Sequence, residues 1–233
     1  MKEQKLDSAL ELFNKAIEQG PDLPTGYYYL GVTWQRKNDL ERAKDAFEKA
    51  LELKPDYAQA HSSLGLLYWG RGEQAPAVEQ FRQAVMSDPD LAEAHYNLGL
   101  ALSQSGQLDQ AIREFKEAIS LDPKYTDAQI QLGLVLNQNK DSDGAANVFR
   151  ELIRRDPSFA EAHNNLGLVQ LQAGDLAASE AEFAQAVRLK PSYAEAHYNL
   201  GLALRQDGRL VESAAEFEKA YKISPELRNL PRP

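Results

Sequence analysis

The chain has 233 residues, of which 43% are hydrophobic and 26% are charged, and its formal net charge is −9. The absence of cysteine excludes disulfide bonds, thiolate nucleophiles and cysteine-based metal centres. The acidic balance disfavours a nucleic acid as a partner. No apolar run is long enough to span a bilayer, and no basic stretch followed by an apolar one suggests a targeting segment. We therefore expect a soluble protein, cytoplasmic by default, that inserts into no membrane.

Prolines, phenylalanines and glycines recur along the chain with a period of 34 residues. Seven of the eleven prolines have this spacing: Pro21, Pro55, Pro89, Pro123, Pro157, Pro191 and Pro225. Seven of the eight phenylalanines share it: Phe13, Phe47, Phe81, Phe115, Phe149, Phe183 and Phe217. So do six glycines: Gly31, Gly65, Gly99, Gly133, Gly167 and Gly201. A fixed period of roughly 20 to 50 residues indicates an array of stacked repeats, each burying its apolar face against its neighbours.

Each period has the pattern of two helices joined by a turn, as residues 92–125 illustrate. The apolar residues of the first half end before Gly106, which suits the left-handed position at a helix C-terminus. Apolar residues then recur at spacings of three and four, Phe115 and Ala118 among them. Pro123 ends the second helix, because proline disfavours helical geometry in the residue before it. The sequence therefore predicts an all-α repeat protein.

These residues resemble the consensus of the tetratricopeptide repeat (TPR) family. The family pattern has Leu-Gly in the first helix, Ala-x3-Phe-x2-Ala in the second and a closing proline, as at Ala111, Phe115, Ala118 and Pro123. The resemblance implies a right-handed α-solenoid of stacked antiparallel helix pairs, with the first helices lining a concave groove. In chain order we expect the second helix of a truncated repeat at 1–23, six repeats at 24–57, 58–91, 92–125, 126–159, 160–193 and 194–227, and a C-terminal tail at 228–233.

Some residues depart from this pattern, and the fourth repeat departs most. Lys140 occupies the place of the interhelical glycine, Gly144 weakens the start of the following helix, and Leu152 stands where alanine is usual. Ser179 and Ser213 replace the same kind of small apolar residue in later repeats. Because each repeat in an array is stabilised by its neighbours, we expect the fourth repeat to open most readily.

Both ends of the array are expected to be incompletely packed. The helix within residues 1–23 lacks a partner helix, and residues 228–233 contain two prolines that disfavour a capping helix. Exposed apolar ends would favour end-to-end association between copies. The apolar side chains expected to be partly exposed at the first end are Leu6, Leu10, Phe13 and Ile17.

The histidines occupy the fourth position of their repeats: His61, His95, His163 and His197. Equivalent positions in an array are separated by a whole repeat, so these side chains do not converge on one metal ion or nucleophile. We interpret them as packing residues. The sequence contains no phosphate-binding glycine loop, nucleophile elbow or metal-binding helix motif. We therefore expect no enzymatic activity, no metal and no cofactor.

Amide side chains precede the Leu-Gly pair in several first helices. Asn97, Asn165 and Asn199 occupy this position in three repeats, with Gln131 and Ser63 in two others. Amides offer donors and an acceptor, so a ladder of them along the inner surface can bind an extended peptide by its backbone. The asparagines resemble the ladder in the TPR superhelix of O-linked N-acetylglucosamine transferases. The alternative interpretation is ordinary consensus usage, because asparagine is common at this position in the family.

A stripe of residues three or four apart along each first helix is the candidate groove. Its centre is apolar and its edge is acidic; alternatively, the leucines pack between helices and the carboxylates complement helix dipoles. The predicted groove residues are Tyr28, Gln59, Leu66, Glu93, Tyr96, Asn97, Leu100, Gln104, Asp127, Gln131, Leu134, Gln138, Glu161, Asn164, Asn165, Leu168, Gln172, Glu195, Tyr198, Asn199, Leu202 and Arg205.

The function that this pattern favours is a non-enzymatic protein-interaction scaffold. Its partner is expected to be a protein or peptide with apolar and basic residues, which complement the apolar centre and acidic edge of the stripe. Two alternatives stay open: the chain is the targeting or substrate-recognition arm of a larger enzyme, such as a glycosyltransferase, or it is a scaffold that self-assembles through its ends into a homo-oligomer.

Overall fold

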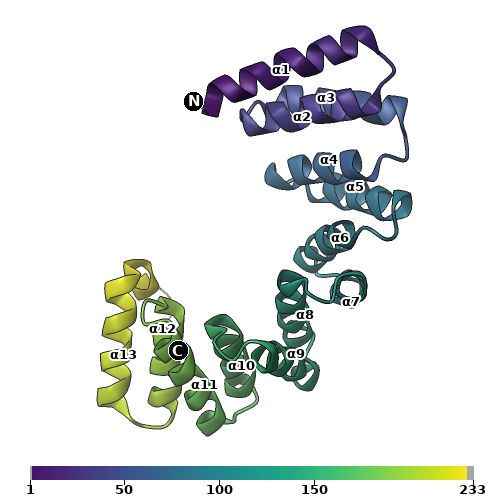
Figure 1. The fold of residues 1–233 in the computed structure, drawn as a ribbon. Coiled ribbons are helices and arrows are strands. Elements are labelled where there is room, and N and C mark those ends of the chain that lie inside the picture. The colour runs from purple at the N-terminus through teal and green to yellow at the C-terminus, as the bar shows by residue number, and fades with distance from the viewer. Residues whose placement is uncertain (1, 230–233) are drawn as a thin grey trace. The chain divides into compact units, whose positions relative to one another are not determined.

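The computed structural model describes residues 2–229, which form thirteen α-helices and one short 3-10 helix and contain no β-strand (Figure 1). The chain divides into two compact units at residues 125 and 126. The helices of unit 1 are α1 (Lys2–Gln19), α2 (Pro24–Arg36), α3 (Leu40–Leu53), α4 (Ala58–Gly70), α5 (Gln74–Ser87), α6 (Ala92–Gln104) and α7 (Leu108–Leu121). Those of unit 2 are α8 (Thr126–Gln138), α9 (Ser142–Arg155), α10 (Ala160–Gln172), α11 (Leu176–Leu189), α12 (Ala194–Gln206), α13 (Leu210–Ile223) and η1 (Pro225–Asn229).

Within each unit, consecutive helices pack against each other as the predicted repeat pattern requires. In unit 1, α2 packs on α3, α4 on α5 and α6 on α7, while α1 covers one side of α2. In unit 2 the pairs are α8 with α9, α10 with α11 and α12 with α13. The second helix of one pair also contacts the first helix of the next, as α3 contacts α4 and α11 contacts α12. The all-α repeat architecture expected from the period is confirmed.

The turn between the two helices of a pair requires a left-handed residue. Gly106 has φ of +75°, and a side chain there would meet no atom within 4 Å, so only the backbone conformation selects glycine. Lys140 adopts the same conformation, with φ of 65°. Asn38 does so too, with φ of 62°, so the first repeat also lacks the interhelical glycine, a departure that the sequence analysis overlooked. Asparagine tolerates this region better than lysine does.

The core of each repeat is a phenylalanine ring packed against a glycine of the first helix. A Cβ at Gly99 would lie 2.7 Å from the Phe115 ring, which is closer than carbon atoms pack, and Phe115 is fully buried. The first helix therefore approaches the second closely at Gly99, where a glycine backbone contacts an aromatic ring. Phe217 in α13 is only half-buried, because no further helix covers that side of unit 2 in the described residues.

The departures from consensus are accommodated within the core. Leu152 is buried in α9. The Ser179 hydroxyl donates to the Leu176 carbonyl at 2.9 Å, and the Ser213 hydroxyl donates to the Gly201 carbonyl at 2.7 Å. Both serines are buried, and these hydrogen bonds satisfy the hydroxyl donors that replace alanine.

The N-terminal end differs in part from the expectation. Leu6, Phe13 and Ile17 are half-buried, and the Phe13 ring stacks on Tyr29 with centroids 5.6 Å apart. Leu10 is buried, so the prediction that it is partly exposed is wrong, because α1 turns this residue toward α2. The exposed apolar residue of α1 is instead Leu12, at 66%.

The C-terminal end continues past α13 in η1, whose Leu227 packs beside Tyr198 and Tyr221. Arg228 lies in this 3-10 helix, so the start of the predicted tail is helical for one short turn. The remaining tail residues, 230–233, and Met1 lie outside the described residues.

Candidate functional site

The predicted apolar centre of the groove is partly exposed in both units. In unit 1, Leu66 of α4 is 40% exposed and Leu100 of α6 is half-buried. In unit 2, Leu134 of α8 is 39% exposed, and Leu168 of α10 and Leu202 of α12 are half-buried. We call the surface around these five leucines, considered separately in each unit, the first-helix face. When a partner covers partly exposed apolar side chains such as these, the removal of apolar surface from water lowers the free energy of the complex.

The edges of the first-helix face are polar and exposed. At the N-terminal ends of the first helices lie Gln59 and Glu93 in unit 1 and Asp127, Glu161 and Glu195 in unit 2. At their C-terminal ends lie the exposed amides Gln104, Gln138 and Gln172. The Gln172 amide oxygen accepts a hydrogen bond from Asn137 at 2.7 Å. The face therefore combines an apolar centre with one acidic and one neutral polar edge.

The predicted amide ladder lies mostly beneath this surface. Asn97 and Asn165 are buried, and Asn164 is only 3% exposed. Asn199 is half-buried and donates to the Asn164 amide oxygen at 2.9 Å, which ties α12 to α10. Gln131 is half-buried. The contact of these amides with a peptide backbone stays a prediction, and in this structure the ladder residue Asn199 is already bonded to Asn164.

The aromatic residues assigned to the groove differ in accessibility. Tyr28 and Tyr96 are half-buried, whereas Tyr198 is buried against Phe217 and Tyr221. Tyr28 packs on Tyr57 with centroids 5.1 Å apart. These rings therefore pack against neighbouring aromatic side chains, and only Tyr28 and Tyr96 stay partly accessible.

A cleft of ≈ 270 Å³ lies between α12 and α13 in unit 2. The predicted groove residues Tyr198, Leu202 and Arg205 line it together with side chains of α13. The Arg205 guanidinium lies 5.9 Å from the centre of the Phe217 ring. The predicted groove consists of first-helix residues alone, so it lacks the α13 residues that line this cleft. They are Leu210, Ser213, Ala214, Phe217, Glu218 and Tyr221.

A second cleft, of ≈ 760 Å³, lies at the N-terminal ends of α10 and α12. Glu161 and Glu195 line it together with Tyr193, which the sequence analysis also missed. Burial raises the pKa of the Tyr193 hydroxyl to about 12, and the two carboxylates act in the same direction. The Lys190 ammonium lies over the Tyr193 ring at 5.0 Å.

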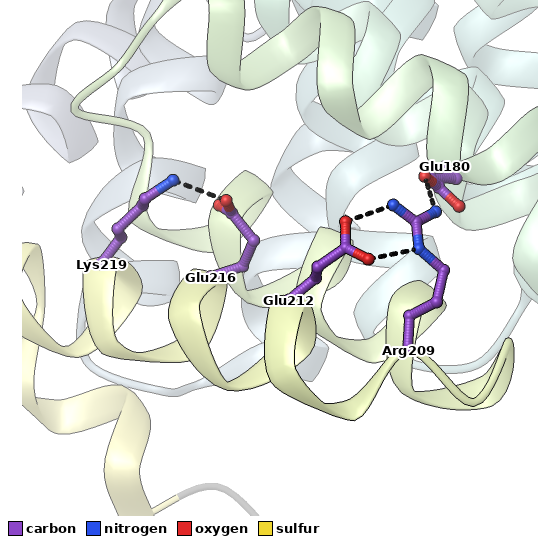
Figure 2. Close-up of polar contacts among 5 residues, drawn as sticks. All are labelled: Glu180, Arg209, Glu212, Glu216 and Lys219. Carbon is purple, nitrogen blue, oxygen red and sulfur yellow. Dashed lines mark hydrogen bonds and ion pairs between the residues drawn. The ribbon is translucent and has the colours of Figure 1, made fainter.

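Two groups of charged side chains lie along α13, one at its start and one farther along the helix (Figure 2). Arg209, the residue that precedes α13, bridges Glu212 on α13 and Glu180 on α11. Farther along, Lys219 bonds Glu216 at 2.6 Å. The Arg209 contacts link α11 to the start of α13.

The described residues contain no group of three or more histidine, aspartate or glutamate side chains placed to hold a metal ion. The four histidines are buried, as their interpretation as packing residues predicts. They also make hydrogen bonds that the sequence analysis did not foresee. None of the helices in residues 2–229 is both long and apolar enough to cross a membrane.

The fold defines an all-α helical-repeat protein. Residues 96–158, 130–194 and 164–227 match the tetratricopeptide repeat profile, and residues 35–72 and 70–106 match a second TPR profile. The chain belongs to the tetratricopeptide repeat family, whose members generally mediate protein–protein interaction. No curated protein matches the chain.

Several solved structures share the fold. The TPR protein YrrB, described as having an unusual peptide-binding site, is 26% identical and superposes with a TM-score of 0.74 over 86% of this chain and 100% of its own. PilF of Pseudomonas aeruginosa is 21% identical, with a TM-score of 0.69 over 87% of this chain and 92% of its own. A TPR protein fragment from Cytophaga hutchinsonii is 17% identical, with a TM-score of 0.74 over 96% and 92%. The last two similarities show the fold alone.

Proposed function

We propose that this chain is a non-enzymatic scaffold whose first-helix face binds a peptide or helix of a partner protein, and that the bound segment carries apolar and basic residues. The observation that carries the proposal is the partial exposure of the leucines along that face. Leu66 and Leu134, at 40% and 39%, are among the most exposed leucines in the first helices of their units. A fully covered leucine side chain contributes about 1.5–3 kcal/mol relative to an exposed one.

The charges beside these leucines support a basic partner. Glu93 in unit 1, and Glu161 and Glu195 in unit 2, are exposed at one edge of the face. Each also lies in the first turn of its helix, where a carboxylate complements the helix dipole, and this structural role does not prevent binding. Exposed charges of this kind mainly set the rate of encounter and the selectivity, while apolar anchors hold the complex.

The relation to YrrB supports a peptide as the bound element. That protein is described as having a peptide-binding site, and its whole length matches 86% of this chain at 26% identity. Within each unit, the first-helix face presents leucine side chains from successive first helices. Such a surface suits either an extended segment or an amphipathic helix.

The proposal is tested by selecting binders from a phage-displayed library of random peptides. We expect the selected peptides to combine aliphatic residues with lysine or arginine. Leu66→Asp and Leu134→Asp should each weaken binding of the selected peptides at least tenfold. Met86→Asp is the matched control, because Met86 is 72% exposed on the second helix α5, away from the first-helix face. Selection of acidic peptides, or equal loss in the control, would overturn the proposal.

A further inference from the structure

Three of the four histidines form the same three-part contact. His95 of α6 places Nδ1 2.7 Å from the Glu114 carboxylate of α7 and Nε2 3.0 Å from the Pro89 carbonyl, which precedes α6. His163 Nδ1 lies 2.6 Å from the Glu182 carboxylate, and its Nε2 lies 3.2 Å from the Pro157 carbonyl. His197 Nδ1 lies 2.6 Å from the Glu216 carboxylate, and its Nε2 lies 3.1 Å from the Pro191 carbonyl.

This geometry requires a proton that a neutral histidine and an ionised glutamate do not have. A carbonyl oxygen only accepts, so Nε2 carries a hydrogen. An ionised carboxylate also only accepts, so Nδ1 carries one too and the ring is an imidazolium. If the ring is instead neutral, the carboxyl group carries the proton and donates it to Nδ1. In either arrangement the contact holds one proton, and removing it leaves two acceptors facing each other.

We infer that these contacts are proton-dependent clamps, which hold each of three first helices against its second helix and against the preceding loop, and which make the packing of both units respond to pH. We call the contacts of His95, His163 and His197 the histidine clamps. The three rings are buried, and the side chains of Glu114, Glu182 and Glu216 are only 24%, 26% and 14% exposed. Solvent therefore screens the contacts weakly. The clamped helices α6, α10 and α12 also carry Leu100, Leu168 and Leu202 of the first-helix face.

The fourth histidine provides an internal comparison. His61 Nδ1 lies 2.7 Å from the amide oxygen position of Gln80, and Nε2 lies 2.9 Å from the Pro55 carbonyl. An amide has both a donor and an acceptor, so Gln80 can donate its NH2 to Nδ1 of a neutral ring. The same packing is therefore satisfied at His61 without an added proton.

Other charges near the clamps come from the packed helices. Glu114 and Glu117 of α7 act on His95, and the hydrogen bond to Glu114 is the main cause that raises the pKa of His95. Burial alone would raise the pKa of Glu216, but hydrogen bonds from Lys219 and His197 outweigh it and lower that pKa.

The residues before the three clamp prolines are also charged, but their side chains turn elsewhere. The Asp88 carboxylate accepts a hydrogen bond from the Asp90 amide, and the Asp156 carboxylate accepts from the Ser158 amide. The Lys190 ammonium lies over the Tyr193 ring. Each of these groups therefore interacts within its own turn.

The sign of the pH effect follows from these directions. The folded-state pKa of His95 lies above that of an unfolded histidine, about 6.5. Its contribution is fully present below that value and is lost as the pH rises through the folded-state pKa. The folded-state pKa of Glu216 is lowered, so its contribution is lost as the pH falls through that pKa. Acidification through the raised folded-state pKa of His95 should therefore stabilise the His95 clamp, until the pH falls below the pKa of an unfolded histidine.

The first test is nitrogen-15 NMR of the histidine rings in the full chain at pH 7.5. We expect His95, His163 and His197 to show protonated signals at both ring nitrogens, or a shared proton with the carboxyl group, and His61 to show the neutral Nε2–H tautomer. Four histidines with the same neutral spectrum would overturn the inference. This measurement uses the wild-type protein and requires no variant to fold.

The second test converts histidine–glutamate contacts into histidine–glutamine contacts, and the reverse. The triple variant Glu114→Gln, Glu182→Gln, Glu216→Gln should fold, because it reproduces the His61–Gln80 contact, and should lose most of the pH dependence of urea unfolding between pH 6 and 8. Gln80→Glu should add a pH-dependent contribution to the free energy of unfolding. For His95, whose folded-state pKa is raised, the unfolding equilibrium changes up to about tenfold for each pH unit between its unfolded-state and folded-state pKa values. An unchanged pH dependence in the triple variant would contradict the inference.

Discussion

Replacing Lys140 by glycine should stabilise the protein, because Lys140 is held in a left-handed conformation. Its φ is 65°, close to the values that the turns after α4, α6, α10 and α12 achieve with glycine. The left-handed region costs a residue with a side chain about 1–2 kcal/mol. Glycine loses about 0.5–1 kcal/mol more conformational entropy on folding. The difference predicts that Lys140→Gly raises the free energy of unfolding by about 0.5–1 kcal/mol.

The reverse substitution at an equivalent turn is the control. Gly106 has φ of +75°, and a Cβ added there would have no atom within 4 Å, so Gly106→Ala changes the backbone preference without a steric clash. It should lower the free energy of unfolding by about 0.5–1 kcal/mol, by the same balance of backbone strain and chain entropy. Asn38→Gly should have a smaller effect than Lys140→Gly, because asparagine tolerates the left-handed region.

Urea unfolding followed by circular dichroism measures the total effect, and hydrogen exchange locates it. In the wild type we expect residues 126–159 to exchange faster than residues 58–125, because α8 and α9 contact each other less extensively than the other pairs and their turn contains the strained lysine. Lys140→Gly should slow exchange mainly in residues 126–159. The reasoning is refuted if Lys140→Gly is neutral or destabilising while Gly106→Ala has no effect, or if the wild type protects residues 126–159 as well as its neighbours.

Three further predictions concern binding, the core and the ends. Replacing the acidic edge residues by glutamine should slow association with the partner and flatten the salt dependence of the association rate. Leu100→Asp should instead increase the dissociation rate, by more than the glutamine replacements do. Surface plasmon resonance between about 0.05 and 0.5 M salt measures both rates. The edge residues to replace are Glu93, Glu161 and Glu195. Phe115→Leu should destabilise the chain more than Phe217→Leu in calorimetry, because only the first ring is fully buried, and equal effects would contradict this. If copies associate end to end, Leu210→Glu in α13 should reduce the mass measured by light scattering at high concentration, and a monomer at every concentration would exclude the association.

The repeat architecture was predictable from the sequence because it depends on local spacing. Proline, phenylalanine and glycine at a period of 34 residues specify helix ends, ring positions and close approaches. Each of these acts within one repeat or between neighbours, so the pattern alone indicates the all-α array. The leucine and carboxylate positions of the first-helix face also follow from helical spacing, and their role in binding stays a prediction.

Other features depend on which side chains meet across helices, and sequence spacing did not determine them. The burial of Asn164, the hydrogen bond that it accepts from Asn199 and the burial of Leu10 depend on how far each helix turns toward its neighbour. The histidine clamps carried a signal that was overlooked, because each histidine is followed 19 residues later by glutamate, or by glutamine in the case of His61. That spacing becomes meaningful only once the two helices are packed. A hydrogen bond needs atoms within about 3 Å in a fixed orientation, and only the tertiary structure decides that.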